Sequence, residues 1–471
     1  MQPGSSGSAE LFKMKKSHPQ KIGRYKLLGP IGRGGMSLVY RALEPESEDI
    51  VALKLLFPLQ TLAETLGMEE LKNIFWAEAR KMAGLNHPHI VKVHDLEPDN
   101  QTPYFTMDYH CTNIGMMINE NFILEEKTRI IIPQKVLDYG SQILEGLRYI
   151  HDEGIIHRDI KPHNILVTDT DTVKICDFGT AMQEDEEIFD SPRLKVGSPY
   201  YIAPEQSLNP ENADQRSDLY SVGVMLYRML TGELPNIKNI KLSRINPIYD
   251  YRWDNFFSKA LEHDPARRFQ NAHEMAAALM DLELHLEKKI NSTCRTSSSG
   301  MQNASKAARE EVRTLPLRAA GVNAKKAFQV NELWQPIKYT ENIFTDRTEE
   351  TIVDSATGLI WKIMDNGSPV SHADADSYIE ILNDSRKSRI SRWRLPTVNE
   401  LLTLVHNPRL SENSCPNDVW QQENQWYWSC DRRSEKTSWY VNTRLGYTGW
   451  QQNNCRNHVR AVASLSKKQT R

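Results

Sequence analysis

The chain contains 471 residues, which is too many for a single hydrophobic core and suits two or three domains. Hydrophobic residues make up 39% of the chain and charged residues 25%, as in an ordinary globular protein. A formal net charge of −3 provides no electrostatic attraction to nucleic acid, so we do not expect a partner of this class.

The beginning of the chain is rich in glycine, serine and lysine, and we expect a flexible tail over residues 1–24. This tail lacks the apolar core of a signal peptide, and no run of about eighteen apolar residues occurs in the sequence. Six cysteines in a chain of this length do not form a dense disulfide framework. We therefore expect a cytoplasmic protein without a membrane span, in which free thiols are the default.

Short apolar runs broken by glycines extend from Tyr25 to Leu56 and predict a twisted antiparallel sheet with a flexible glycine hairpin. Such glycines let backbone amides approach a polyphosphate without interference from a Cβ atom. Most glycine hairpins only turn the chain, so the phosphate interpretation depends on the residues that follow.

The next predicted strand carries two features that suit a nucleotide. Ala52 leaves room for a flat ring, and Lys54 places a cation beside phosphates. A helical stretch over residues 66–85 contains Glu78, a carboxylate that can hold this ammonium in place. Taken alone, a strand lysine or a helix glutamate is more often a solvated surface charge.

Two further strands are expected over residues 90–95 and 104–109, and the second ends in a polar connector over residues 108–111. The free backbone groups of this connector can pair with the edge of an adenine. Apolar residues at helical spacing then predict a core helix over residues 133–153.

The following stretch contains an acid, a cation and a metal ligand within six residues, namely Asp159, Lys161 and Asn164. Phosphoryl transfer needs these three groups, because an acid must lie near the incoming hydroxyl and Mg²⁺ takes oxygen ligands. A second acid, Asp177, follows in an Asp-Phe-Gly tripeptide.

The ordered series of glycine loop, strand lysine, helix glutamate, His-Arg-Asp, Asp-Phe-Gly and Ala-Pro-Glu resembles the protein kinases, in particular the eukaryotic-like Ser/Thr kinases of bacteria. The resemblance covers residues 25–286 and implies a bilobal α+β fold. It also implies ATP and Mg²⁺ as cofactors, with Mn²⁺ as a possible substitute, and protein substrates. Lys161, two residues after the catalytic acid, suits a Ser/Thr kinase.

The same resemblance implies a role for each matching residue. Asp159 would accept the proton of the substrate hydroxyl, and Lys161 would contact the γ-phosphate. Asn164 and Asp177 would hold Mg²⁺. The nucleotide site would consist of Ile31, Gly32, Gly34, Gly35, Ser37, Val39, Ala52, Lys54, Glu78, Met107, Asp108 and Leu166.

Structural and regulatory roles follow from the family in the same way. Asp218 would anchor the catalytic loop from beneath, and Glu205 would form a buried pair with Arg268. Ser198 stands where the family usually has threonine, and its hydroxyl can still bond Asp159. Ser37 likewise replaces the third glycine of the loop.

The resemblance also implies that activity depends on an anion near Arg158, because this arginine precedes the catalytic aspartate. Ser191 is our candidate autophosphorylation site. The acidic residues between 184 and 190 are an alternative source of the anion, and a simply solvated acidic loop is a third interpretation.

Met275, Leu279, Leu282 and Leu286 form an apolar stripe that we expect to pack on its own domain, with dimerisation as the less favoured alternative. Residues 287–331 have no sustained hydrophobic period and are interpreted as a partly ordered linker.

Most of the tryptophans lie beyond Glu332. We interpret residues 332–466 as short strands around two helices, at 376–384 and 397–405, with Gly358 in a tight turn. The fragments that carry a second resemblance are Thr351 to Trp361, Trp393 to Thr397, Trp426 to Cys430 and His458 to Val462.

In this order they resemble the C-terminal domain of the Legionella collagen-like proteins, which implies a fold similar to C-type lectins. Its ligand or protein partner is unknown. We favour a core position for Trp361 and Trp393.

The cysteines of this part allow three single disulfides among Cys415, Cys430 and Cys455. A redox-sensing kinase that uses Cys430 and Cys455 is one alternative function. A recognition module with a weakly active or scaffolding kinase domain is another. A metal site at Cys455 and His458 is disfavoured, because no partner motif accompanies it.

Overall fold

The computed structural model describes residues 20–97, 102–121, 126–178, 182–183, 200–235, 241–297, 309–345, 347–384, 392–405 and 426–465. Several predictions fall outside these ranges, namely those on the acidic residues between 184 and 190, Ser191, Ser198 and Cys415. Within them, no helix is both long enough and apolar enough to cross a membrane.

The first lobe is a six-stranded antiparallel sheet in the order β1-β2-β3-β4-β6-β5. Its strands are β1 (Lys21–Ile22), β2 (Tyr25–Arg33), β3 (Ser37–Leu43), β4 (Ile50–Leu56), β5 (Val93–Glu97) and β6 (Tyr104–Asp108). Between β4 and β5 the chain forms α2 (Gln60–Leu66) and α3 (Met68–Gly84), which are separated by Gly67 at φ +80°. The buried face of α3 includes Phe75 and Glu78.

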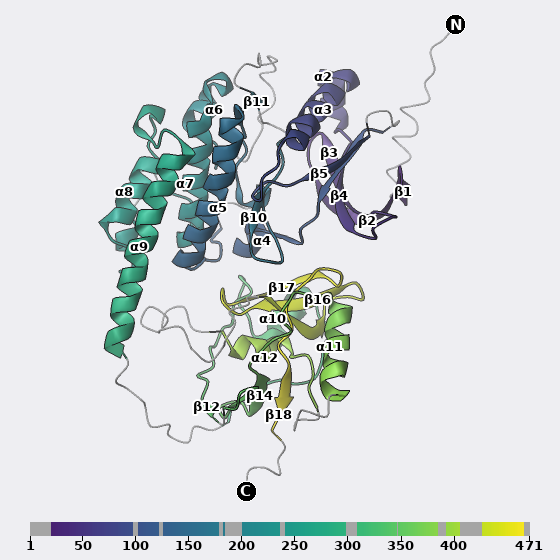
Figure 1. Cartoon of the computed structure of the whole chain (residues 1–471), viewed down its shortest axis with the longest axis vertical. Helices are drawn as coiled ribbons and strands as arrows, with labels where there is room; N and C mark the ends of the chain where they lie inside the picture. The colour runs from purple at the N-terminus through teal and green to yellow at the C-terminus, as the bar shows by residue number, and fades with distance from the viewer. Residues whose placement is uncertain are drawn as a thin grey trace.

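The second lobe is mainly helical (Figure 1). Its longer helices are α5 (Pro133–Asp152), α7 (Gln215–Thr231), α8 (Tyr251–Ala260) and α9 (Ala272–Ser297). α7 is buried along nearly its whole length, including the polar residues Asp218 and Arg228. Asp214 caps its N-terminus, and Gly232 at φ +73° ends it.

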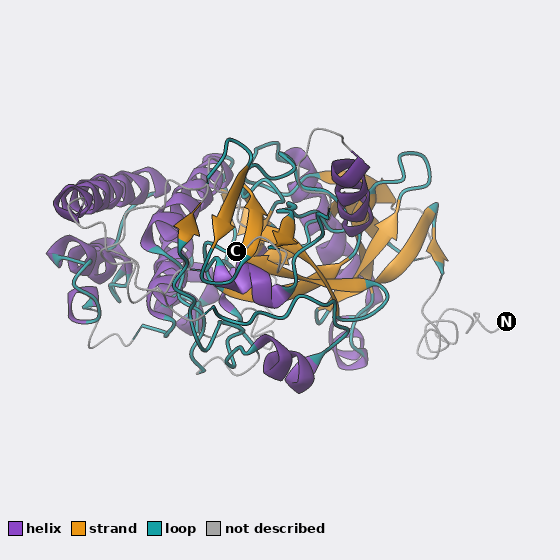
Figure 2. Cartoon of the chain, turned by 90° about the horizontal axis from the view of Figure 1, so that it is seen from below, coloured by secondary structure: helices purple, strands orange, loops and turns teal. Residues whose placement is uncertain are grey.

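Short elements complete this lobe. They are β7 (Thr112–Asn113), α4 (Ile114–Ile118), β8 (Ile155–Ile156), β9 (Ile165–Val167), β10 (Val173–Ile175), β11 (Met182–Gln183) and α6 (Pro204–Leu208), with 3₁₀ turns at Pro162–Asn164, Pro210–Asn212, Leu242–Arg244 and Pro265–Arg267. The view from below shows most helices on one side and the sheet of the first lobe on the other (Figure 2).

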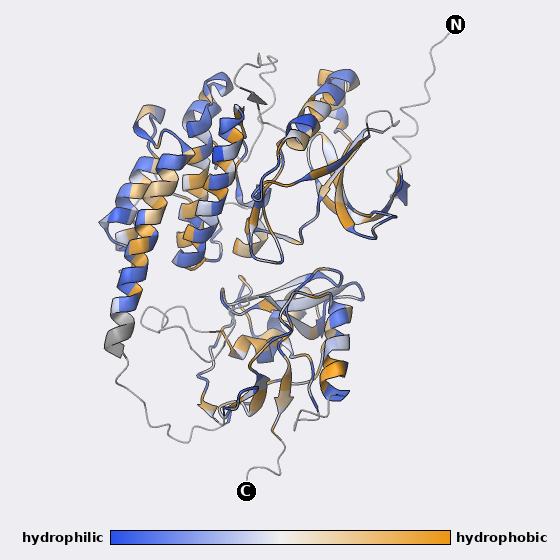
Figure 3. Ribbon diagram, in the orientation of Figure 1, coloured by the Kyte–Doolittle hydropathy of each residue, from blue (hydrophilic) through white to orange (hydrophobic). Residues whose placement is uncertain are grey.

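The predicted apolar stripe on α9 packs inside its own domain. Met275, Leu279, Leu282 and Leu286 are at most 3% exposed, and α9 contacts α5. Hydrophilic and hydrophobic residues alternate along α9 (Figure 3). The favoured packing role of the stripe is therefore confirmed.

The C-terminal part contains two sheets. One has four strands, β12 (Phe344–Thr345), β13 (Thr351–Asp354), β14 (Leu359–Lys362) and β18 (Val462–Ser464); the other has three, β15 (Trp426–Arg432), β16 (Thr437–Asn442) and β17 (Tyr447–Gln452). The helices are α10 (Gly321–Phe328), α11 (His372–Asp384) and α12 (Val398–Thr403). Gly358 makes the predicted turn at φ +71°, and Trp361 and Trp393 are buried core residues, as predicted.

The segment before residue 332 belongs to this packing unit, whereas the sequence predicts a linker there. Ala324 and Phe328 of α10 are buried in the same apolar cluster as Trp439. Trp439 also donates from its indole nitrogen to the Ala319 carbonyl at 3.0 Å. The sequence does not reveal this packing, because a helix of only 8 residues is too short to show a sustained hydrophobic period.

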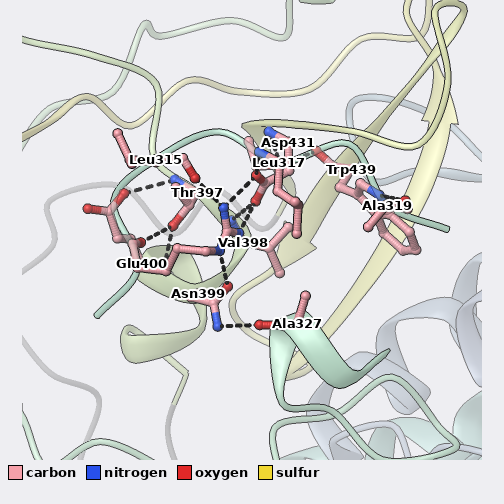
Figure 4. Close-up of polar contacts among 12 residues, drawn as sticks. Leu315, Leu317, Ala319, Ala327, Thr397, Val398, Asn399, Glu400, Asp431 and Trp439 are labelled. Atoms are coloured by element: carbon pink, nitrogen blue, oxygen red, sulfur yellow. Dashed lines mark hydrogen bonds and ion pairs between the residues drawn. The ribbon is translucent and has the colours of Figure 1, made fainter. Parts of the chain in front are cut away.

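A buried carboxylate ties this segment to the domain (Figure 4). Asp431 is fully buried and accepts hydrogen bonds from the backbone amides of Leu317 and Val398, both at 2.7 Å. Arg313 donates to both oxygens of the same carboxylate, at 2.9 and 2.5 Å. Beside it, Thr397 and Glu400 form a capping box that starts α12.

The cysteine expectations are corrected by the structure. Cys455 forms a disulfide with Cys111, 344 residues earlier, so neither a free thiol nor a pair with Cys415 or Cys430 describes it. Cys430 is a free thiol. The sequence interpretation failed because it compared only cysteines of the C-terminal domain, whereas the partner lies between the first and second lobes.

Candidate active site

Lys54 is the centre of a buried charge cluster. It lies on β4 and donates to Glu78 Oε1 on α3 at 2.5 Å and to Asp177 Oδ1 at 2.8 Å. Lys54 is 5% exposed and Glu78 is 3% exposed, so neither is the solvated surface charge of the alternative interpretation. The fold thus joins residues from a strand, a helix and a loop.

The electrostatics of this cluster keep Lys54 and Asp177 charged. The Lys54 ammonium lowers the pKa of Asp177 well below its usual range. Burial lowers the pKa of Lys54, but the carboxylates of Asp177 and Glu78 together raise it above its ordinary value. Burial raises the pKa of Glu78, although Lys54 opposes this change. A buried cation and a partly exposed anion are therefore held side by side.

Hydrogen bonds join Lys161 and Asn164 to Asp159 within the loop over residues 157–166, which we call the catalytic loop. Lys161 Nζ lies 2.6 Å from Asp159 Oδ2, and Asn164 Nδ2 donates to the same oxygen at 2.9 Å and to the Asp159 carbonyl at 2.8 Å. Burial raises the pKa of Asp159, with Lys161 acting in the opposite direction. The three residues that the sequence places within six positions therefore also lie together in space.

Asp218 holds this loop from α7. Its fully buried carboxylate accepts from the backbone amides of His157 at 2.9 Å and Arg158 at 2.7 Å. His151 Nε2 lies 2.8 Å from the same carboxylate, a contact that sequence reasoning missed. Asp218 thereby fixes the backbone of the two residues before Asp159.

The residues present fit a divalent cation. Both side-chain hydrogen bonds of Asn164 use its amide nitrogen, which leaves its carbonyl oxygen as a ligand. The Asp177 side chain is 45% exposed, so a cation can reach its ionised carboxylate. Oxygen ligands of this kind suit Mg²⁺.

The lining predicted for an adenine lies on neighbouring strands. Ala52 of β4 is the register partner of Met107 on β6, and Val39 of β3 is the register partner of Lys54. Leu166 lies across the lobes on β9. Asp108 directs its carboxylate away from this lining, toward His94 at 2.9 Å.

The glycine hairpin joins β2 and β3, and Gly34 donates its amide to the Ser37 carbonyl at 2.9 Å. A Cβ atom added to Gly32 or Gly35 would meet no atom within 4 Å. Packing among the described residues therefore does not require glycine at these positions, whereas a phosphate close to the backbone would. Ile31 is 48% exposed at the edge of the hairpin.

Two further contacts concern the predicted structural residues. Arg268 donates to both oxygens of Glu205 at 2.7 Å, and its side chain is almost fully buried. Arg158 has φ +66° and donates to the Ala213 carbonyl at 3.4 Å.

Sequence reasoning missed Glu120, a buried carboxylate just after α4. It lies 3.1 Å from His163 of the catalytic loop and 3.1 Å from Arg228 of α7, and it accepts from the Tyr201 hydroxyl at 2.5 Å. No sequence motif identifies Glu120, because its three partners lie far from it and from one another along the chain. Its contacts connect the catalytic loop to the helical lobe.

Comparison with known proteins agrees with this architecture. The protein kinase domain family matches residues 25–298, which is more than half of the chain. The chain therefore belongs to the protein kinase family, and the expectation of a kinase fold followed by a smaller α+β region is confirmed. A second family, the Lcl C-terminal domain, matches residues 350–463.

Two of the similar curated proteins come from bacteria. A probable serine/threonine-protein kinase of Clostridium acetobutylicum is 32% identical over 275 residues, and the match covers 55% of this chain and 40% of that protein. The serine/threonine-protein kinase PrkC of Bacillus subtilis is 31% identical over 269 residues, covering 54% and 40%. The chain thus spans about two fifths of the length of these relatives.

Among solved structures, the kinase domain of Mycobacterium tuberculosis PknI is similar at 26% identity and a TM-score of 0.43, covering 56% of this chain and 97% of that one.

Proposed function

We propose that this chain is a Ser/Thr protein kinase that transfers the γ-phosphoryl group of ATP to Ser or Thr hydroxyls of proteins. The observation that carries the proposal is the convergence of Lys54, Glu78 and Asp177 close to Asp159. Each of these residues comes from a different element, so the fold rather than the local sequence assembles the cluster.

In this proposal, bound Mg²⁺ neutralises charge on the transferred phosphoryl group. Asn164 and Asp177 hold the cation, and Mn²⁺ can take its place. Lys54 binds the α- and β-phosphates while Glu78 fixes its ammonium. Asp159 orients the substrate hydroxyl and accepts its proton, and Lys161 contacts the γ-phosphate.

The C-terminal part is proposed to bind a ligand or a protein partner and so to regulate or target the kinase. The two small sheets with α11 and α12 support the proposal of a C-type-lectin-like domain. We also propose a cytoplasmic location. A dimer, if one forms, uses another surface than the α9 stripe, because that stripe is buried.

Arg158 and Ser191 are proposed as the regulatory pair. The backbone amide of Arg158 donates to the Asp218 carboxylate at 2.7 Å, and Arg158 immediately precedes Asp159 in the chain. A phosphate on Ser191 that neutralises Arg158 would therefore act on the loop that carries the catalytic acid.

The proposal is tested with the full chain, radiolabelled ATP and Mg²⁺. We expect autophosphorylation in the wild type, a loss of at least about 100-fold in Asp159→Asn, and phosphate on Ser191 by mass spectrometry. Exposed Asp374, which lies on α11, provides the matched control Asp374→Asn, with unchanged labelling.

Persistent labelling in Asp159→Asn would refute the role of Asp159. A wild type that binds a partner but turns over no ATP would favour the recognition-module alternative. Phosphoproteomics of cells with either form then identifies the substrates.

A further inference from the structure

The C-terminal domain is covalently tied to the connector between the kinase lobes. Asp108 ends β6, the strand that carries Met107 of the predicted adenine lining. Cys111 follows three residues later and immediately precedes β7. Its disulfide partner Cys455 follows β17, and the two Cα atoms are 6.0 Å apart. In Figure 1, β16 and β17 lie next to α4 and β10 of the kinase.

Non-covalent contacts hold the same two surfaces together. Gln451 donates from Nε2 to Thr112 Oγ1 at 3.2 Å, one residue from the disulfide. The Arg129 guanidinium, 5% exposed, lies 3.8 Å from the centre of the Tyr447 ring. Because these contacts do not need the disulfide, the two thiols stay neighbours after reduction and the bond can form again.

The C-terminal segment faces both lobes as well as the connector. A cavity of about 350 Å³ is bounded by residues 48–50 of the first lobe, 109–112 of the connector, 167–169 of the second lobe and 454–458 of the C-terminal domain. A tie at this place restrains the angle between the lobes, since it lies at the connection about which they would move.

The cavity provides a route to the disulfide from the Cys111 side. Cys111 and Cys455 both line it, and Cys111 is half-buried whereas Cys455 is buried. Cys430 is a less suitable redox group, because burial raises the pKa of its thiol to about 12 and the reactive thiolate is then scarce at neutral pH.

We propose that reversible formation of the Cys111–Cys455 disulfide controls nucleotide release by the kinase. In the oxidising direction the two thiols react with a low-molecular-weight disulfide through a mixed disulfide; the Cys111–Cys455 bond forms, the reagent's S–S bond breaks, and two reagent thiols leave with the protons. A dithiol reductant reverses the exchange. Disulfides in a reducing compartment are often transient and redox-sensing. The inference rests on nucleotide binding by the proposed kinase.

The test uses the full chain and a fluorescent ADP analogue, whose release is followed by stopped flow without any phosphoryl transfer. Non-reducing peptide mass spectrometry first identifies the Cys111–Cys455 peptide pair after treatment with oxidised glutathione. We expect release from the oxidised chain to be slower than from the reduced chain by about 5-fold or more.

Cys455→Ser and Cys111→Ser should release at the rate of the reduced chain in both conditions. Cys430→Ser, the matched control, should keep the redox response of the wild type. Using wild-type protein in both redox states keeps the test valid even if a variant folds poorly.

Three results would overturn the inference. They are two cysteines that remain thiols under oxidised glutathione, equal release in the two redox states, and a response that persists in Cys455→Ser. A chain that binds no nucleotide in either state overturns the proposed function as well, so the two failures are distinguishable.

Discussion

At the scale of single residues, the site consists of groups whose charge depends on a few contacts. Lys54 keeps Asp177 ionised, and Asp159 is held by Lys161 and Asn164. Removing Lys54 would leave two carboxylates, Glu78 and Asp177, without their shared cation. An uncompensated buried charge is costly, so Glu78, which is 3% exposed, depends most on Lys54.

We expect the acid limb of the pH–rate profile to lie above the ordinary range of an aspartate. Burial raises the pKa of Asp159, and the proposed base must be deprotonated to accept a proton. Activity is then present above this raised pKa and falls as the pH decreases through it. The measurement is kcat/KM as a function of pH, from about one unit below the reference aspartate pKa of about 3.9 up to about pH 9.

Unfolding must be excluded as the cause of the acid limb. Circular dichroism at each pH provides this control. An acid limb at or below the ordinary aspartate pKa, with the fold intact, would contradict the expectation.

At the scale of elements, the C-terminal domain depends on segments that are far apart in the chain. Asp431 on β15 joins the stretch before α10 to the start of α12 through Arg313, Leu317 and Val398. The carboxylate is fully buried, so its removal would leave each of these donors without a hydrogen-bond acceptor.

Asp431→Asn is therefore expected to destabilise the C-terminal domain by about 3 kcal/mol, since it breaks a buried pair with Arg313 and replaces an acceptor by a donor. Denaturant unfolding followed by tryptophan fluorescence measures the change. Glu435→Gln is the matched control, because the Glu435 side chain is 86% exposed and pairs with Arg318 only at 3.7 Å. Equal effects of the two substitutions would contradict the structural role of Asp431.

At the scale of the whole molecule, the docking of the C-terminal domain on the kinase is the decisive feature. The Tyr447 ring covers the Arg129 guanidinium, which also donates to the Met116 carbonyl at 3.1 Å. Burial lowers the pKa of Arg129, as expected for a charge removed from water. Desolvated contacts between a cation and a ring stabilise by about 2 kcal/mol.

Tyr447→Leu should weaken the docking by roughly this amount of about 2 kcal/mol when the disulfide is reduced. Hydrogen–deuterium exchange of residues 112–118 and 126–131 is expected to increase. Tyr447→Phe keeps the ring and should leave exchange unchanged. Faster exchange in Tyr447→Phe as well, or in neither variant, would show that the ring does not hold this contact.

The sequence by itself determined the kinase fold and the members of its candidate site. Asp159, Lys161 and Asn164 lie within six positions, and the glycine hairpin and β4 are neighbours along the chain, so local spacing is enough to propose their chemistry. The burial of Trp361 and the turn at Gly358 are also readable from local composition. In these cases the physical determinant is a side-chain type or a short period.

Only the tertiary structure decided which distant residues meet. Glu120 has partners from three segments, residues before 332 complete the C-terminal core, and Cys111 meets Cys455 across 344 positions. No local pattern encodes such contacts, because they depend on how two packed units dock. The contact surface between these units, which includes the Cys111–Cys455 disulfide, could therefore not be predicted from the sequence.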